Sequence, residues 1–204
     1  MINKKRKFTY QLEKPVQALP EYKILHKKKW EIVLADPPWR YNDLKTGGSH
    51  KSGSGQHYLT MSKNEICALG DHLKLADNSY LFLWTTHPMI PDALEVIKEW
   101  GYEYRTVAFT WIKKTVNGKD LFGMGRWTRG NPEIILLGIR GKPKPISKAV
   151  ANLTYAEKRR HSEKPEIIYE KIEQLCGKLP RLEMFARKKK NGWSAWGFEL
   201  GMTK

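Results

Sequence analysis

Four consecutive residues, Asp36-Pro37-Pro38-Trp39, have types that suit chemistry on a planar amine. An amine on an aromatic ring shares its lone pair with that ring, so its methylation needs acceptors that hold the two amine hydrogens. Asp36 offers a carboxylate acceptor. Consecutive prolines lack backbone donors and fix φ, so the carbonyl of Pro37 can be held as a second acceptor with little entropy to lose.

Trp39 adds a flat apolar face to this acidic turn. A base inside a duplex is out of reach of such chemistry, so it would be flipped out and stacked on an aromatic ring, at about 1 to 3 kcal/mol per base. We therefore predict that the four residues are catalytic, with the amine of adenine as acceptor and Trp39 as stacking surface. The alternative is that Asp36 only ends a strand and begins a turn through two prolines.

The charge of the chain favours a polyanionic partner. Its 37 Lys and Arg residues against 21 Asp and Glu give a formal charge of +16, which attracts polyanions and repels cations. Basic clusters at residues 4–7, 27–29 and 187–190 are spread along the chain. Nucleic acid is the expected partner, and a well-solvated, lysine-rich surface is the alternative.

Other features exclude several classes of protein. Cys67 and Cys176 lie among apolar neighbours, which predicts buried free thiols in a reducing compartment. No cysteines or histidines have the close spacing of a metal site, so no metal is expected. No apolar run approaches the roughly 18 residues of a membrane span, and we expect a cytoplasmic protein.

Predicted strands and helices alternate along the chain. The strands are expected at 31–35, 79–84, 104–112, 133–139 and 182–186, and the helices at 63–69, 91–100 and from 163 or 164 to 177. Ser62 and Glu65 form a capping-box pattern, and Pro165 falls in the first turn of the last helix. This rhythm predicts an α/β fold, with helices on both faces of the sheet and ligands beyond the carboxyl ends of its strands.

The predicted organisation is one domain with a basic extension. Residues 1–29 are expected to be partly packed or loose, and residues 30–204 to form a single domain whose core begins at Trp30. A loop over 113–130 follows the third strand, and 142–154 reads as a connector. Within 123–131, Arg126 and Trp127 suit contact with phosphates and bases, whereas a solvated loop is the alternative.

The Asp36-Pro37-Pro38-Trp39 run resembles the signature of the MT-A70 family, adenine methyltransferases that include the eukaryotic mRNA-modifying subunit and prokaryotic DNA enzymes. Further blocks similar to the family's, in the same order, are Tyr58–Ser62, Leu81–Trp84, Trp111–Lys114, His161–Pro165 and Leu182–Arg187. The resemblance covers roughly residues 30–200. It implies a Rossmann-like class I methyltransferase fold with a mixed, mostly parallel sheet, and S-adenosyl-L-methionine as methyl donor.

The resemblance also implies residue roles. The acceptor block precedes the cofactor strand, the permuted order of beta-class DNA methyltransferases, so Asp36, Phe185 and Arg187 are expected near the cofactor. The closing segment 192–199 adds Phe198 and Glu199. The family more often has a polar residue where Phe198 stands, so aromatic packing competes there, while Glu199 could accept from a ribose hydroxyl.

Two further groups follow from the same resemblance. Lys164, with Ser162, is expected to meet the methionine carboxylate, because a helix N-terminus and an ammonium both favour an anion. Capping of a surface helix is the alternative. Tyr58, Trp84 and Lys113 are expected near the target base.

The leading hypothesis is a DNA adenine methyltransferase that flips its base, because the chain is short and has no added RNA-binding domain. RNA adenosine methylation by the same chemistry and a catalytically silent nucleic-acid-binding subunit are alternatives. Methylation of a protein side-chain amide is a third. A homodimer or heterodimer and a prokaryotic or phage origin are compatible with the resemblance.

Overall fold

The computed structural model describes residues 22–41, 60–123, 127–159 and 163–200. At its centre is a seven-stranded sheet in the order β5-β3-β4-β2-β1-β6-β7. The strands are β1 (Trp30–Ala35), β2 (Leu75–Thr85), β3 (Glu103–Lys114), β4 (Glu133–Arg140), β5 (Leu153–Glu157), β6 (Arg181–Met184) and β7 (Ser194–Trp196). β4 runs antiparallel to β2 and β3, and the other neighbours are parallel. The mixed, mostly parallel sheet is confirmed.

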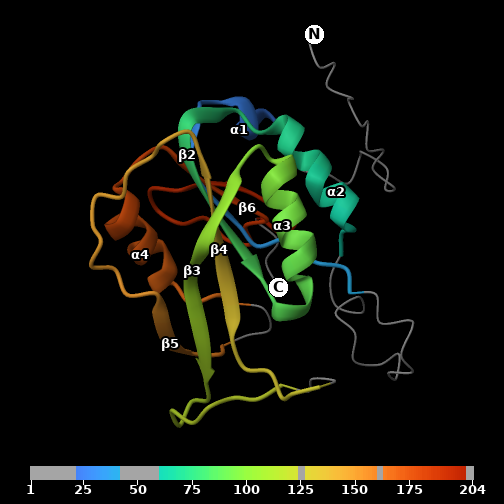
Figure 1. Cartoon of the computed structure of the whole chain (residues 1–204), viewed down its shortest axis with the longest axis vertical. Coiled ribbons are helices and arrows are strands. Elements are labelled where there is room, and N and C mark those ends of the chain that lie inside the picture. The colour runs from blue at the N-terminus through green and yellow to red at the C-terminus, as the bar shows by residue number, and fades with distance from the viewer. Residues whose placement is uncertain (1–21, 42–59, 124–126, 160–162, 201–204) are drawn as a thin grey trace.

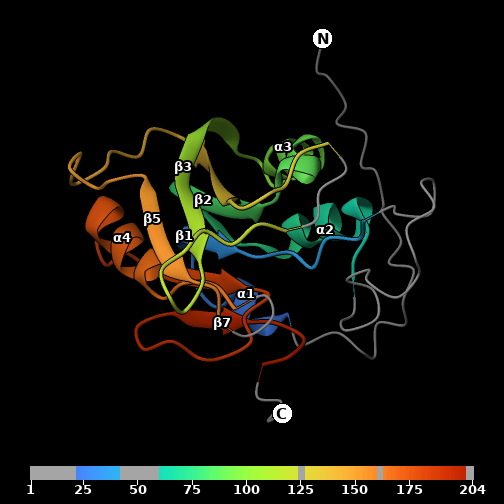
Figure 2. The same ribbon diagram turned by 90° about the horizontal axis from the view of Figure 1, so that it is seen from below.

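Helices lie on both faces of this sheet, as predicted. They are α1 (Lys23–His26), α2 (Lys63–Ala68), α3 (Ile90–Glu99) and α4 (Ile167–Cys176), with short 3-10 turns at Leu69–His72 and His87–Met89. Figures 1 and 2 show α2 and α3 on one side and α4 on the other. On β2, Leu81 and Leu83 belong to the core cluster of α2 and α3, whereas Phe82 belongs to that of α4. Alternate residues of one strand thus fill two cores.

Local signals set the helix ends. The Ser62 side chain accepts from the Glu65 backbone N–H, and the Glu65 carboxylate accepts from the Ser62 backbone N–H at 2.7 Å, so the predicted capping box is present. α4 ends before Gly177, which has a φ of +83°. It begins at Ile167, three residues later than Lys164, so Lys164 lies on the approach to the helix.

The sequence did not predict three elements at the margins of the sheet. β5 extends beyond the predicted connector, and its Leu153 and Tyr155 are 46% and 64% exposed. β7 has only three residues, and α1 only four. Short, half-exposed edge elements carry no clear hydrophobic periodicity. Leu25 of α1 is fully buried, so the core begins before Trp30.

Two compositional expectations can also be compared with the structure. Cys67 and Cys176 are both buried and free, as predicted. Within the described ranges, no helix has the length and apolar character that crossing a bilayer requires.

Candidate active site

The parallel strands bring separated residues to one end of the sheet, here called the carboxyl end. Asp36 directly follows β1, and Lys113 lies at the end of β3. β4 runs in the opposite direction, so its first residue, Glu133, reaches the same end. Lys164 arrives from the segment before α4. This end lies at the bottom of the sheet in Figure 1.

The four side chains form a line of alternating charges. Lys164 Nζ lies 3.0 Å from Asp36 Oδ1 and 3.2 Å from Glu133 Oε2. Lys113 Nζ lies 2.7 Å from Glu133 Oε1. Each of the four side chains is between 17% and 26% exposed. We call this set (Asp36, Lys164, Glu133, Lys113) the charge network, and its formal charges cancel.

Burial and neighbours shift the pKa values within the charge network. Burial raises the pKa of Asp36, and although Lys164 opposes this, the net shift is upward. Burial also raises the pKa of Glu133, but the two ammonium groups beside it outweigh burial and lower it overall. Burial lowers the pKa of Lys164, but the two carboxylates outweigh burial and raise it overall. Lys164 therefore stays charged, while Asp36 becomes a more basic acceptor.

Hydrogen bonds within the acidic turn and to Met61 hold its backbone in place. Trp39 N donates to the Pro37 carbonyl at 2.8 Å, and Met61 N donates to the Pro38 carbonyl at 2.8 Å. Arg40 N donates back to the Met61 carbonyl at 3.0 Å. Among the described residues, the Pro37 carbonyl thus accepts one hydrogen bond, and its second lone pair offers another acceptor position.

Tryptophans lie beside the two lysines of the charge network. Trp39 is 6% exposed, and its indole N–H donates to the Trp84 carbonyl at 3.1 Å. Trp84 and Trp111 are each 2% exposed and pack edge to face at 6.2 Å. Lys164 Nζ lies 5.3 Å from the ring centre of Trp84. Stacking of a base on Trp39 or Trp84 would require exposing a ring that is now covered.

Tyr41 is a site residue that the sequence analysis missed. Its hydroxyl lies 2.7 Å from Thr86 Oγ1, just beyond the end of β2. Burial raises the pKa of Tyr41, and the carboxylates of Glu133 and Asp36 add to the effect. Tyr41 is partly exposed, unlike the tryptophans. The sequence shows an aromatic residue two positions after Trp39, but it does not show that this residue lies beside the end of β2.

A second set of predicted residues gathers beyond β6. Phe185 has a φ of +63°, a left-handed conformation that turns the chain sharply after the strand. Its ring packs against Trp196 at 5.7 Å and Phe198 at 6.4 Å. Gly197 passes so close to Ala186 that a Cβ would collide with its backbone. Phe198 therefore packs against aromatic neighbours, and its contact with the cofactor stays a prediction.

Arg187 and Glu199 meet in the same region. Arg187 Nε lies 3.5 Å from Glu199 Oε2, with the side chains 37% and 30% exposed. Asp36 is joined to this region through its backbone N, which donates to the Met184 carbonyl at 3.5 Å. The two predicted groups are thus adjacent at the carboxyl end of β1 and β6.

Of the remaining predicted residues, Trp127 alone lies within the described ranges. Trp127 is 99% exposed on the chain between β3 and β4. Tyr58, Arg126 and Ser162 lie outside the described residues.

Glu183 is a partly buried acid that the sequence analysis also missed. Tyr169 donates its hydroxyl to Glu183 Oε1 at 2.8 Å, while Oε2 finds no hydrogen-bond partner among the described residues. Burial raises the pKa of Glu183 to about 7, and the nearby Asp36 carboxylate contributes. The sequence could have pointed to Glu183, because it is a glutamate inside the otherwise apolar run 182–186.

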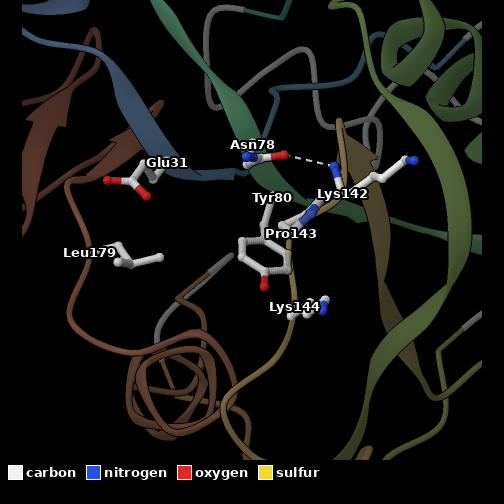
Figure 3. Close-up of a pocket in the computed structure, with 7 residues that line it drawn as sticks. All are labelled: Glu31, Asn78, Tyr80, Lys142, Pro143, Lys144 and Leu179. Carbon is white, nitrogen blue, oxygen red and sulfur yellow. Dashed lines mark hydrogen bonds between the residues drawn. The ribbon is translucent and has the colours of Figure 1, made fainter.

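A cavity of about 310 Å³ lies at the opposite, amino end of the sheet (Figure 3). Its lining residues are Glu31, Asn78, Tyr80, Lys142, Pro143, Lys144 and Leu179. The Asn78 side chain accepts from Lys142 N at 2.7 Å, and the Tyr80 ring points into the space. None of the predicted site residues lines it.

The fold and the carboxyl end of the sheet define a class of protein. A mostly parallel sheet, covered on both faces and carrying Asp-Pro-Pro-Trp at the end of a central strand, is that of a Rossmann-like methyltransferase. The MT-A70 family profile matches residues 30–199. The chain therefore belongs to the MT-A70 family of adenine N6-methyltransferases, and the predicted resemblance is confirmed.

Individual relatives agree with this assignment. The chain is 32% identical to the Type II methyltransferase M.MunI of Mycoplasma sp over 220 aligned residues, which cover 100% of this chain and 91% of that protein. It is 30% identical to the human N(6)-adenosine-methyltransferase catalytic subunit METTL3 over 78% of this chain but 26% of that protein. The match to the Drosophila melanogaster N(6)-adenosine-methyltransferase MT-A70-like protein is 32% identical, over 78% of this chain and 24% of that protein.

Proposed function

We propose that this chain methylates the exocyclic 6-amino group of adenine in DNA, on a base flipped out of the duplex, with S-adenosyl-L-methionine as methyl donor. The observation that carries the proposal is the Asp36 carboxylate, which stands at the carboxyl end of β1 with a raised pKa and with Lys164 beside it at 3.0 Å.

The acceptor chemistry follows from the turn itself. Asp36 accepts one amine hydrogen and the free lone pair of the Pro37 carbonyl accepts the other, which directs the nitrogen lone pair out of conjugation. The nitrogen then bonds to the methyl carbon as the carbon–sulfur bond breaks. The product nitrogen must lose one proton, and a carboxylate with a raised pKa is suited to receive it.

Lys164 and Glu133 position this acceptor. Lys164 lowers the pKa of Asp36, which opposes the effect of burial and favours the ionised carboxylate. Glu133 holds Lys164 from the other side at 3.2 Å, so the ammonium is fixed between two carboxylates. Both are positioning residues in this proposal.

The residues beyond β6 suit the methyl donor, which supplies an electrophilic methyl group on a sulfonium. The left-handed turn at Phe185 and the close passage of Gly197 shape the backbone beside Asp36. Glu199 can accept from ribose hydroxyls, and Arg187 orients it through their ion pair. Lys164 is held by two carboxylates, so a contact with the methionine carboxylate would compete with these pairs.

DNA is favoured over RNA by the extent of the similarity. The match to M.MunI spans 91% of that relative, and Type II methyltransferases are DNA-modification enzymes. The matches to the N(6)-adenosine-methyltransferases span about a quarter of each. The charge of +16 suits either polyanion. The same similarity supports action in a prokaryotic or phage-infected cytoplasm.

The test is a comparison of substrates. The purified chain is incubated with labelled methyl donor and either unmethylated plasmid DNA or RNA transcribed from it, and the nucleosides are then analysed. We expect N6-methyladenine in DNA, and far less of it with Asp36→Asn. Label in RNA alone would replace the proposed substrate, and nucleic-acid binding without any label would identify a silent subunit.

A further inference from the structure

The described residues between β3 and β4, 115–123 and 127–132, are here called the arm. It leaves the sheet at the carboxyl end, between Lys113 and Glu133 of the charge network. In Figure 1 it projects from the bottom of the sheet. Residues 124–126 lie outside the described ranges and are not part of the arm as defined.

The root of the arm, where it joins the sheet, is held by several hydrogen bonds. Asn131 is 8% exposed, and its side-chain oxygen accepts from Lys113 N at 2.8 Å. Its side-chain nitrogen donates to the carbonyls of Lys113 and Leu121, at 2.9 and 2.6 Å. Gly123 N donates to the Gly130 carbonyl at 2.6 Å, which joins the two sides further out. One buried amide thus fixes the direction of the arm relative to the charge network.

The outer part of the arm exposes large apolar side chains. Trp127 is 99% exposed, Val116 79% and Phe122 55%. Tryptophan is on average highly buried, so a ring wholly in solvent on an anchored segment is unusual. Exposed apolar groups among polar and basic ones mark contact surfaces, and Lys119 and Arg129 flank these residues in the sequence.

Base flipping calls for an apolar group that can replace the flipped base in the stack. An extruded adenine leaves a gap in the base stack, and the unstacking opposes flipping. Proteins that distort duplexes often insert apolar wedges between base steps, and aromatic rings stack on any base. A wedge must project beyond the protein surface, be flat and apolar, and be aimed from a fixed root near the catalytic acceptor. Trp127 combines these properties among the described residues.

We propose that Trp127 is a wedge that enters the duplex beside the target adenine and fills the space the flipped base vacates. This inference rests on the proposed function, which it deepens by assigning the step that makes the adenine accessible. The substrate class that follows is duplex DNA, since a single strand offers no gap to fill.

The test separates flipping from binding and from folding. After the methylated sequence has been mapped, kcat/KM is measured on that duplex and on a second duplex in which the target adenine faces an abasic site. We expect Trp127→Ala to lower kcat/KM about 10- to 100-fold on the paired duplex. The loss should shrink to less than about threefold on the second substrate, where the adenine is already unpaired.

Matched variants sharpen the result. Trp127→Phe should retain most of the activity because a phenyl ring still stacks, and Phe122→Ala, on the same arm, should lose less than about threefold. Equal losses of Trp127→Ala on both substrates, or no loss, would overturn the wedge while leaving adenine methylation intact. A loss accompanied by a dimer-to-monomer change in solution would make Trp127 an interface residue instead. If the wild-type chain did not methylate duplex DNA, the wedge and the proposed function would both fall.

Discussion

The two ends of the same sheet carry similar residue types but organise them differently. At the carboxyl end, Lys164 and Asp36 are 3.0 Å apart and 18% and 26% exposed. At the amino end, Lys29 and Asp77 are 3.8 Å apart and 60% and 89% exposed. The first pair continues into Glu133 and Lys113, whereas no further ion pair reaches the second within the described part of the chain. The candidate active site is distinguished by its partial burial and by ion pairs that share residues, and not by the number of its charges.

The topology explains this difference. The parallel strands β1, β2, β3 and β6 end at the same edge of the sheet, and the antiparallel β4 begins there. Side chains from separate segments therefore meet at partial burial, where charges interact strongly enough to shift pKa values. The amino end instead has a cavity lined by Glu31, Lys142 and Lys144, with both lysines exposed.

The largest expected effect comes from Asp36→Asn. The amide keeps the shape of the side chain but loses its charge, and we expect kcat for methyl transfer to fall about 100- to 1000-fold. Transfer of labelled methyl groups to DNA measures this loss. Binding of the methyl donor and the thermal midpoint should stay close to the wild type, because Lys164 keeps Glu133 as a partner. Activity within about threefold of the wild type would remove Asp36 from its assigned role.

Lys164→Met tests whether the ion pair between Lys164 and Asp36 matters for activity. Lys164 lowers the pKa of Asp36, so without it that pKa rises further and less carboxylate is ionised at a given pH. We expect activity about 10- to 100-fold lower at pH 7, with the acid limb of the pH–rate profile moved to higher pH. Lys164→Arg is the control, because it retains the charge. A profile that superimposes on the wild type after scaling would contradict the positioning role.

Much of this end of the sheet could be predicted from the sequence. Asp36 and Lys164 stand in motifs, and the apolar runs of the central strands predict the sheet between them. Glu133 and Tyr41 could not be found in this way, because their positions depend on the direction of β4 and on the end of β2. The edge strands β5 and β7 were not predicted for a different reason. β5 exposes one face, and β7 is too short to show a hydrophobic period. Periodicity identifies buried strands but does not orient them.

Glu183→Gln tests a carboxyl group whose burial outweighs the opposing charge of Lys188, in contrast to Glu133, where two ammonium groups outweigh burial. The pKa of Glu183 is raised from 4.5 to about 7 in the folded chain, so its ionisation opposes folding. The stability it contributes is present below pH 4.5 and is lost as the pH rises through about 7. The variant should therefore be more stable than the wild type by about 3 kcal/mol at pH 8 and nearly equal at pH 4.5. Denaturant unfolding at both pH values measures this, and an equal difference at both would exclude the linkage.

The smallest effect is expected from Lys29→Ala, at the amino end. Exposed ion pairs contribute about 0 to 1 kcal/mol, and Asp77 is hydrated whether or not Lys29 is present. The free energy of unfolding should change by less than about 0.5 kcal/mol, and kcat should be unchanged. The salt dependence of DNA binding is the informative measurement, because Lys29 belongs to the basic cluster 27–29 and removing one cation that neutralises a phosphate lowers that slope by about one. A fall in kcat comparable to that of Lys164→Met would show that the two ends of the sheet are coupled, and the contrast between a linked and an isolated ion pair would no longer locate the active site.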